Sequence, residues 1–298
     1  MKWRSNIAND RSFSWQAHKS SLILEKLNWL NPKGSVKNKQ SCGFTPSTTN
    51  SFDWPYSFFL PNFMTHFIDS AFAPNICMVQ TTQHLLQHHD FDVHPDQAKT
   101  EMMALLQQQF QLPHPLILQK QEHKDRAIEY NDQPTSHFRH RTDACFTRKQ
   151  AVICAVMTAD CLPVFLADKN GQWVSAIHCG WRSLFQNIIS KTFSKIKANP
   201  KYTQAYLGPC IQQKNYQVDE QFLKNFITQH PDTESAFTTV INGKSHADLQ
   251  TIARIQLQQL GIIDIQASTD CTYELTDKYH SWRRDQNPKR MASLIWMT

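Results

Sequence analysis

A cysteine and two histidines stand where apolar runs of the sequence end. Cys161 lies in the tetrapeptide TADC, His178 follows seventeen residues later in AIHCGW, and His123 ends the segment PLILQKQEH. Polar residues at the ends of apolar strands are well placed to line a pocket. Two imidazoles and one thiolate form a common ligand set for catalytic zinc, with a fourth position left for water or substrate. A zinc ion in such a site could lower the pKa of a bound water molecule and polarise a leaving group.

The same residues allow two other interpretations. Cys161 and His178 could form a thiolate–imidazolium nucleophile pair, in which Asp160 or Asp143 orients the histidine. Alternatively, Cys161 is a buried core thiol beside hydrogen-bonded core histidines. No CxxC or HExxH motif is present, so these residues alone leave all three interpretations open. A tightly bound, stoichiometric zinc would argue against a free nucleophile.

Three arginines cluster further along the chain. The segment YHSWRRDQNPKRMAS places Arg283, Arg284 and Arg290 within eight positions, beside Trp282. Guanidinium groups pair with phosphate or carboxylate, and a neighbouring aromatic ring suits stacking on a base. Arg182, in the segment AIHCGWR, could join them. A solvated basic face is the alternative interpretation.

Alternating strands and helices must position these side chains. The patterns predict strands within 115–123, 151–168 (two strands interrupted by TADC), 173–178, 204–210, 262–267 and 292–297, and helices within 98–112, 182–197, 218–230 and 247–261. Near-continuous apolar strands indicate sheets that are covered on both faces. We therefore expect an α/β protein with layered sheets and helices, and a site at the strand ends.

The basic charge of the chain is confined to its first forty residues. Of the 31 Lys and Arg and the 25 Asp and Glu, residues 1–40 hold eight and two, which accounts for the whole net charge of +6. A nucleic-acid-binding protein would instead cluster Lys and Arg on a folded face. We expect residues 1–50 to form a basic, poorly structured extension and residues 51–298 to form a single catalytic domain.

Other protein classes lack their signatures. No apolar stretch has the length of a membrane span, and the first fifteen residues lack the apolar region of a secretory signal. Eight cysteines in such a chain are expected to be mostly reduced thiols in a cytoplasmic protein. None of the seven glycines forms GxGxxG, a P-loop or GxSxG. We therefore expect neither membrane nor nucleic-acid partners.

Four segments in order carry a family resemblance: TADCLPVFLAD, AIHCGWRSLFQNII, YLGPCIQQKNYQVDE and CTYELTDKYHSWRRDQNPKRMAS. Together they resemble the laccase-domain family, whose members have been called multicopper polyphenol oxidoreductases, peptidoglycan editing factors and zinc-dependent purine nucleoside phosphorylases. The resemblance covers roughly residues 75–298. It implies a fold of mixed sheets packed between helices. It also implies that His123, Cys161 and His178 bind zinc.

The resemblance also implies an activity. Similar proteins phosphorolyse adenosine, inosine, guanosine and methylthioadenosine, and deaminate adenosine. We accordingly expect a monomer or small homo-oligomer that binds nucleoside and phosphate, with Cys161, His178 and Asp160 as catalytic residues. The phosphate would be held by arginines drawn from Arg182, Arg283, Arg284 and Arg290.

Three alternatives remain at this stage. One is a hydrolase that edits a peptidoglycan precursor, with Cys161 as ligand or nucleophile. A copper-dependent polyphenol oxidase is the least favoured, because the chain lacks the His-x-His pairs of several copper sites. The third is a zinc-stabilised binding module in which a fourth protein donor closes the site.

The chain also departs from the family pattern at three places. TTQHLLQHH replaces a glycine-rich loop, Lys289 replaces a glycine of the arginine-rich segment, and HCGWRS replaces HAGWRG and adds Cys179. The first two changes lie where they could reshape the substrate cleft.

Overall fold

The computed structural model describes residues 66–67, 72–85, 88–89, 91–94, 100–134 and 140–298. Contacts divide the chain into two units, Met1–Gln40 and Ser41–Thr298, and every described residue lies in the second unit. The predicted extension of residues 1–50 lies outside the described residues. The predicted domain boundary at residue 51 does so too.

A six-stranded mixed sheet forms one layer of this unit. Its order is β13-β10-β8-β9-β6-β5, in which β10 and β13 pair in parallel, β5 and β6 pair in parallel, and the other pairs are antiparallel. The residues of β6 and β9, and all but the last of β8, are buried, as their unbroken apolar sequences require. The strands are β5 (Ala127–Tyr130), β6 (Ala144–Thr147), β8 (Leu162–Asp168), β9 (Val174–Cys179), β10 (Thr203–Leu207) and β13 (Asp264–Ala267).

A four-stranded antiparallel sheet packs against it. Its order is β1-β2-β14-β7, with β1 (His66–Phe67), β2 (Ile76–Gln80), β7 (Cys154–Thr158) and β14 (Met291–Met297). Between the two sheets, Val156 and Ile295 of this sheet share a buried apolar cluster with Phe165 and Ala176 of the other. Two further two-stranded sheets pair β3 (His84–Leu85) with β4 (His88–His89) and β11 (Gln217–Asp219) with β12 (Lys244–His246).

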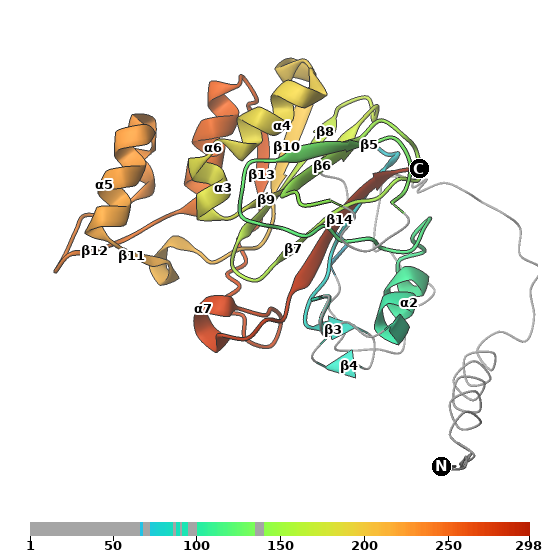
Figure 1. Cartoon of the computed structure of the whole chain (residues 1–298), viewed down its shortest axis with the longest axis horizontal. Coiled ribbons are helices and arrows are strands. Elements are labelled where there is room, and N and C mark those ends of the chain that lie inside the picture. Colours follow the sequence, from blue (N-terminus) through green and yellow to red (C-terminus); the bar gives the residue numbers. More distant parts are fainter. Residues whose placement is uncertain (1–65, 68–71, 86–87, 90, 95–99, 135–139) are drawn as a thin grey trace, which may run out of the picture. The chain divides into compact units, whose positions relative to one another are not determined.

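Helices cover the outer faces of both sheets (Figure 1). Leu184, Ile188 and Leu257 pack onto the six-stranded sheet, and Leu106 and Phe110 pack onto the four-stranded sheet. The first group comes from α3 (Trp181–Phe185), α4 (Ile188–Ile196) and α6 (Leu249–Gln259), and the second from α2 (Thr100–Gln109) and the turn after it. Helices α5 (Glu220–Gln229) and α7 (Trp282–Asp285) complete the described helices. The predicted fold class, mixed sheets packed between helices, is confirmed.

Two predicted elements differ from the structure. The single helix expected over 182–197 is divided into α3 and α4, because Asn187 adopts a left-handed conformation with φ 61°. The strand expected over 115–123 is absent, since the backbone there makes only an isolated bridge between Lys120 and Arg141. Leu116 and Leu118 are nevertheless buried against the four-stranded sheet, which explains the apolar pattern.

The cysteines follow the prediction with one exception. Six described cysteines are free: Cys145, Cys154, Cys161, Cys179, Cys210 and Cys271. Cys77 is disulfide-bonded and is the exception to the expectation of mostly reduced thiols. Spacing along a chain does not reveal pairing between distant cysteines.

Candidate metal centre

His123, Cys161 and His178 converge in the folded chain. Their potential ligand atoms all lie within 4.8 Å of one another, and Cys161 Sγ is 3.9 Å from His123 Nε2. The two imidazole rings meet edge to face with centroids 4.7 Å apart. His178 is buried and His123 is the most exposed of the three, so one side of the cluster faces the surface. Among the described residues, no other group of three His, Cys, Asp or Glu could hold a metal ion.

The sheet brings two of these residues together. Cys161 lies between β7 and β8, and His178 is the penultimate residue of β9. Antiparallel pairing places Leu162 opposite Cys179, so the start of β8 lies beside the end of β9. His123 comes from the loop before β5, where its backbone has a positive φ of 57°.

Asp143 holds both histidines in place. Its carboxylate lies 2.8 Å from His178 Nδ1 and accepts backbone hydrogen bonds from Glu122, His123 and Lys124 at 2.8 to 3.0 Å. The backbone N–H of His178 also donates to the Asp143 carbonyl at 2.7 Å. Of the two aspartates considered from the sequence, it is therefore Asp143 that orients His178.

Gly180 provides the room in which the three side chains meet. A Cβ atom at this position would lie 3.0 Å from Cδ2 of His123 and 3.1 Å from Sγ of Cys161. Contacts this short require the neighbouring atoms to move. A side chain at this position would therefore displace His123 and Cys161 by a few tenths of an ångström.

The cluster favours a thiolate. Burial opposes ionisation of Cys161, but the positive charge of His178 and hydrogen bonds from both histidines lower the pKa of the thiol to about 6. Burial likewise disfavours the imidazolium of His178, whereas the Cys161 thiolate and Asp143 raise its pKa to about 9. The thiolate is the form that binds metals, whereas His178 must lose its proton before it can act as a ligand.

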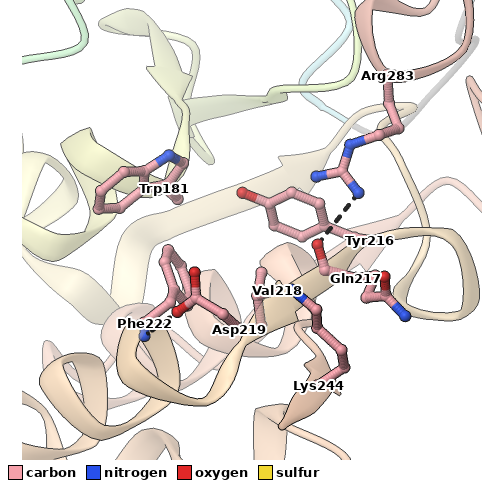
Figure 2. A pocket seen from close by; sticks show the side chains of 8 residues that line it. All are labelled: Trp181, Tyr216, Gln217, Val218, Asp219, Phe222, Lys244 and Arg283. Carbon is pink, nitrogen blue, oxygen red and sulfur yellow. Dashed lines mark hydrogen bonds between the residues drawn. The ribbon is translucent and has the colours of Figure 1, made fainter. Parts of the chain in front are cut away.

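A pocket of about 260 Å³ has Trp181, three residues after His178, in its lining (Figure 2). Trp181 and Phe222 meet edge to face with centroids 4.9 Å apart, and the Arg283 guanidinium lies 5.0 Å from the ring centroid of Tyr216. Burial, and then the negative charge of Cys161, raise the pKa of the Tyr216 hydroxyl, which links this ring electrostatically to the metal centre. The lining residues are Trp181, Tyr216, Gln217, Val218, Asp219, Phe222, Lys244 and Arg283.

One of the four predicted arginines lines the pocket, and a second lies beside one of the lining residues. Arg283 lines it and donates to the Gln217 carbonyl at 3.1 Å. Arg182 is exposed and lies 4.4 Å from the centroid of the lining residue Trp181. Within the described part of the chain, the Arg182 guanidinium has no hydrogen-bond or ion-pair partner.

The other two arginines have different surroundings. All five N–H groups of Arg284 are used, by the Asp285 carboxylate and by the carbonyls of Thr272, Tyr273 and Tyr279. Arg284 therefore has no donor left for a phosphate. Arg290 lies 5.4 Å from the Trp282 centroid and donates to backbone carbonyls, while burial lowers its pKa.

The aromatic pocket was not predicted from the sequence. Phe222 fits the apolar spacing of a helix, and that spacing is equally typical of core packing. Tyr216 lies in one of the four resemblance segments, but nothing in its immediate sequence points toward a site.

The chain belongs to the family described as multi-copper polyphenol oxidoreductase laccase, whose model matches residues 88–298. It is 36% identical over 195 residues to a purine nucleoside phosphorylase of Haemophilus influenzae, covering 65% of this chain and 79% of the relative. It is 33% identical over 187 residues to the purine nucleoside phosphorylase YfiH of Escherichia coli, covering 62% and 75%.

Solved structures share the fold. A Neisseria meningitidis protein of the DUF152 family superposes with a TM-score of 0.69 at 30% identity, over 78% of this chain and 98% of that one. A Bacillus licheniformis hypothetical protein, YfiH, has the same TM-score at 22% identity, over 78% and 96%. None of the helices in the described part of the chain has the length and apolar character that a bilayer crossing requires.

Proposed function

We propose that this chain is a zinc-dependent purine nucleoside phosphorylase, with adenosine, inosine, guanosine and methylthioadenosine as substrates and adenosine deamination as a side activity. The observations that carry the proposal are the His123–Cys161–His178 cluster and an aromatic, cationic pocket whose lining includes Trp181, three residues after His178. Relatives at 31–36% identity that are named purine nucleoside phosphorylases support the reaction class.

The donor set fits zinc. Two imidazoles, one thiolate and a carboxylate that orients a ligand histidine match a three-ligand catalytic zinc site. When bound, zinc would supply Lewis-acid stabilisation of developing negative charge. Multicopper oxidation needs several copper centres, whereas the described residues contain one ligand cluster. We therefore propose zinc as the resident metal.

The pocket residues would bind and orient both substrates. Trp181, Tyr216 and Phe222 present ring faces and edges to a planar purine. Arg182 and Arg283 would hold phosphate, which the free donors of Arg182 favour. A phosphate oxygen would form a bond to the ribose anomeric carbon as the bond to the purine nitrogen breaks, and the purine would leave with a proton. Positioning and charge stabilisation supply most of the rate enhancement for such a transfer.

The decisive experiment measures purine release from inosine and adenosine with and without phosphate. We expect release to require phosphate and to yield ribose 1-phosphate. The variant Cys161→Ala should lose zinc and turnover together. Full zinc and full turnover in that variant would refute the assignment of the site.

The same assay distinguishes phosphorolysis at a zinc site from hydrolysis in which Cys161 is the nucleophile. A hydrolase with a nucleophilic Cys161–His178 pair would release product at the same rate without phosphate. The lowered pKa of Cys161 is compatible with that chemistry, so the phosphate dependence decides between the two.

A further inference from the structure

We infer that Asp160 is a positioning residue that sets where Arg283 lies relative to Cys161. The inference rests on the proposed function in one respect, namely that Arg283 holds the oxyanion. Asp160 directly precedes Cys161 in the loop between β7 and β8. Arg283 belongs to α7, more than a hundred residues further along the chain. Only a tertiary contact can therefore fix the spacing between them.

The carboxylate of Asp160 supplies that contact. One oxygen, Oδ1, accepts a hydrogen bond from the Thr272 hydroxyl at 2.6 Å. The other, Oδ2, accepts from the Ser281 hydroxyl at 3.0 Å and from the backbone N–H of Arg283 at 2.6 Å. The side chains of Thr272 and Ser281 are fully buried, so water does not compete for these bonds.

Hydrogen bonds through Ser281 connect the rest of α7 to Asp160. The hydroxyl of Ser281 donates to Asp160 and accepts a hydrogen bond from the Arg284 backbone N–H at 3.2 Å. The side chain of Arg284 in turn holds the carbonyls of Thr272 and Tyr279. The short helix that carries Arg283 is therefore held at one end by Asp160 and along its side by Arg284.

Asp160 itself is held in an uncommon conformation. Its φ is 81°, in the left-handed region that few residues other than glycine adopt. Its backbone carbonyl accepts a hydrogen bond from the Ile211 N–H at 3.0 Å. Backbone strain of this kind persists where the surroundings impose it, and is frequent at functional sites. The backbone conformation of Asp160 directs its carboxylate toward α7, while Cys161, the next residue, belongs to the metal centre.

Asp143 and Asp160 thus have separate tasks. Asp143 contacts His178 and the loop of His123, whereas Asp160 contacts the segment that carries Arg283. A change at Asp143 should alter metal binding, and a change at Asp160 should alter oxyanion binding. The pair offers a matched comparison in which the same substitution is made at two buried aspartates.

The test compares Asp160→Asn, Ser281→Ala and Asp143→Asn in the zinc-loaded full chain. An asparagine can accept through one atom only, so at position 160 its NH₂ group would face a donor. We expect Asp160→Asn to raise the phosphate Kd, measured by isothermal titration calorimetry, by about tenfold or more. Zinc content should stay within about twofold of the native value, and the KM for inosine should change less than the phosphate Kd. Ser281→Ala, which removes one donor, should show a smaller shift in the same direction.

The outcomes are distinguishable. Unchanged phosphate affinity in folded Asp160→Asn and Ser281→Ala proteins would overturn the inference, as would parallel losses of zinc, inosine and phosphate binding. If Asp160→Asn fails to fold, Ser281→Ala decides alone. A native protein that binds phosphate without releasing purine would refute the proposed function and leave the role of Asp160 standing. A native protein that binds no phosphate would overturn the inference itself.

Discussion

The carboxylate of Asp143 lies 2.8 Å from Nδ1 of His178, and both side chains are buried. This contact engages one ring nitrogen and leaves Nε2 as the nitrogen available to a metal. The same carboxylate accepts the backbone N–H of His123, so a single group orients two of the three proposed ligands. The pKa of Asp143 is lowered, because the contact with His178 and the backbone hydrogen bonds outweigh the opposing effect of burial.

Replacing Asp143 by asparagine should weaken zinc binding. Loss of a carboxylate that orients a ligand histidine typically lowers metal affinity by about 10- to 100-fold. Competition with a zinc-binding dye measures the change. Asp125→Asn is the control, since Asp125 pairs only with Lys191 among the described ion pairs at the surface. Equal affinities for the two variants would contradict the assignment.

Gly180→Ala should disrupt the metal centre more than it disrupts the fold. The added methyl group would press on Cys161 Sγ and the His123 ring, so we expect a loss of zinc affinity. Gly243→Ala is a matched control, because that position also lacks a side chain and has open space around it. Its φ of 71° makes alanine cost about 1 kcal/mol of unfolding free energy without affecting zinc.

Arg284 and Arg182 should respond to alanine substitution in opposite ways. Arg284→Ala leaves three backbone carbonyls without their donor, which should lower the free energy of unfolding by about 2 kcal/mol. Arg182→Ala should leave stability within about 0.5 kcal/mol and raise the KM for phosphate roughly tenfold. Urea denaturation and steady-state kinetics provide the two measurements. A stable Arg284→Ala protein with a raised phosphate KM would show that Arg284 contacts the substrate instead.

The two phenylalanines one helical turn apart on α5 should separate substrate binding from packing. Phe222 lines the pocket, whereas Phe226 is buried in the core. Phe222→Leu should raise the KM for inosine roughly tenfold, since stacking on a base contributes about 1–3 kcal/mol. Phe226→Leu should lower the melting temperature and leave KM unchanged. A KM effect in the second variant alone would place the base elsewhere.

Zinc should stabilise the folded chain through Cys161. A ligand present at a hundred times its Kd adds about 2.7 kcal/mol to the unfolding free energy. We therefore expect the melting temperature of the chelator-treated protein to rise on zinc addition, together with recovery of purine release. Cys161→Ala should show no rise. A similar rise in both proteins would locate the zinc site away from Cys161.

Local sequence patterns predicted six of the fourteen described strands (β7, β8, β9, β10, β13 and β14) and most of the described α-helices, because each of these carries its own apolar pattern. The unbroken apolar runs of β7, β8 and β9 predict buried strands without reference to distant residues. Such patterns do not predict that Asn187 divides the helix into α3 and α4, because this division depends on the conformation of a single residue. Nor do they distinguish a paired strand from residues 116–119, which are buried although they belong to no strand.

For the site, the sequence by itself determined the chemical types: two imidazoles, a thiol, and arginines beside aromatic rings. The tertiary structure alone decided which of them meet. In the structure, Asp143 contacts His178 and Asp160 contacts the segment of Arg283. Among the described residues the Arg182 guanidinium has no hydrogen-bond partner, whereas the donors of Arg284 are used. The physical reason is that hydrogen bonds and electrostatic interactions depend on distance in space. The pairing of β8 with β9 and the loop around Asp143 set those distances, and neither is encoded in local spacing.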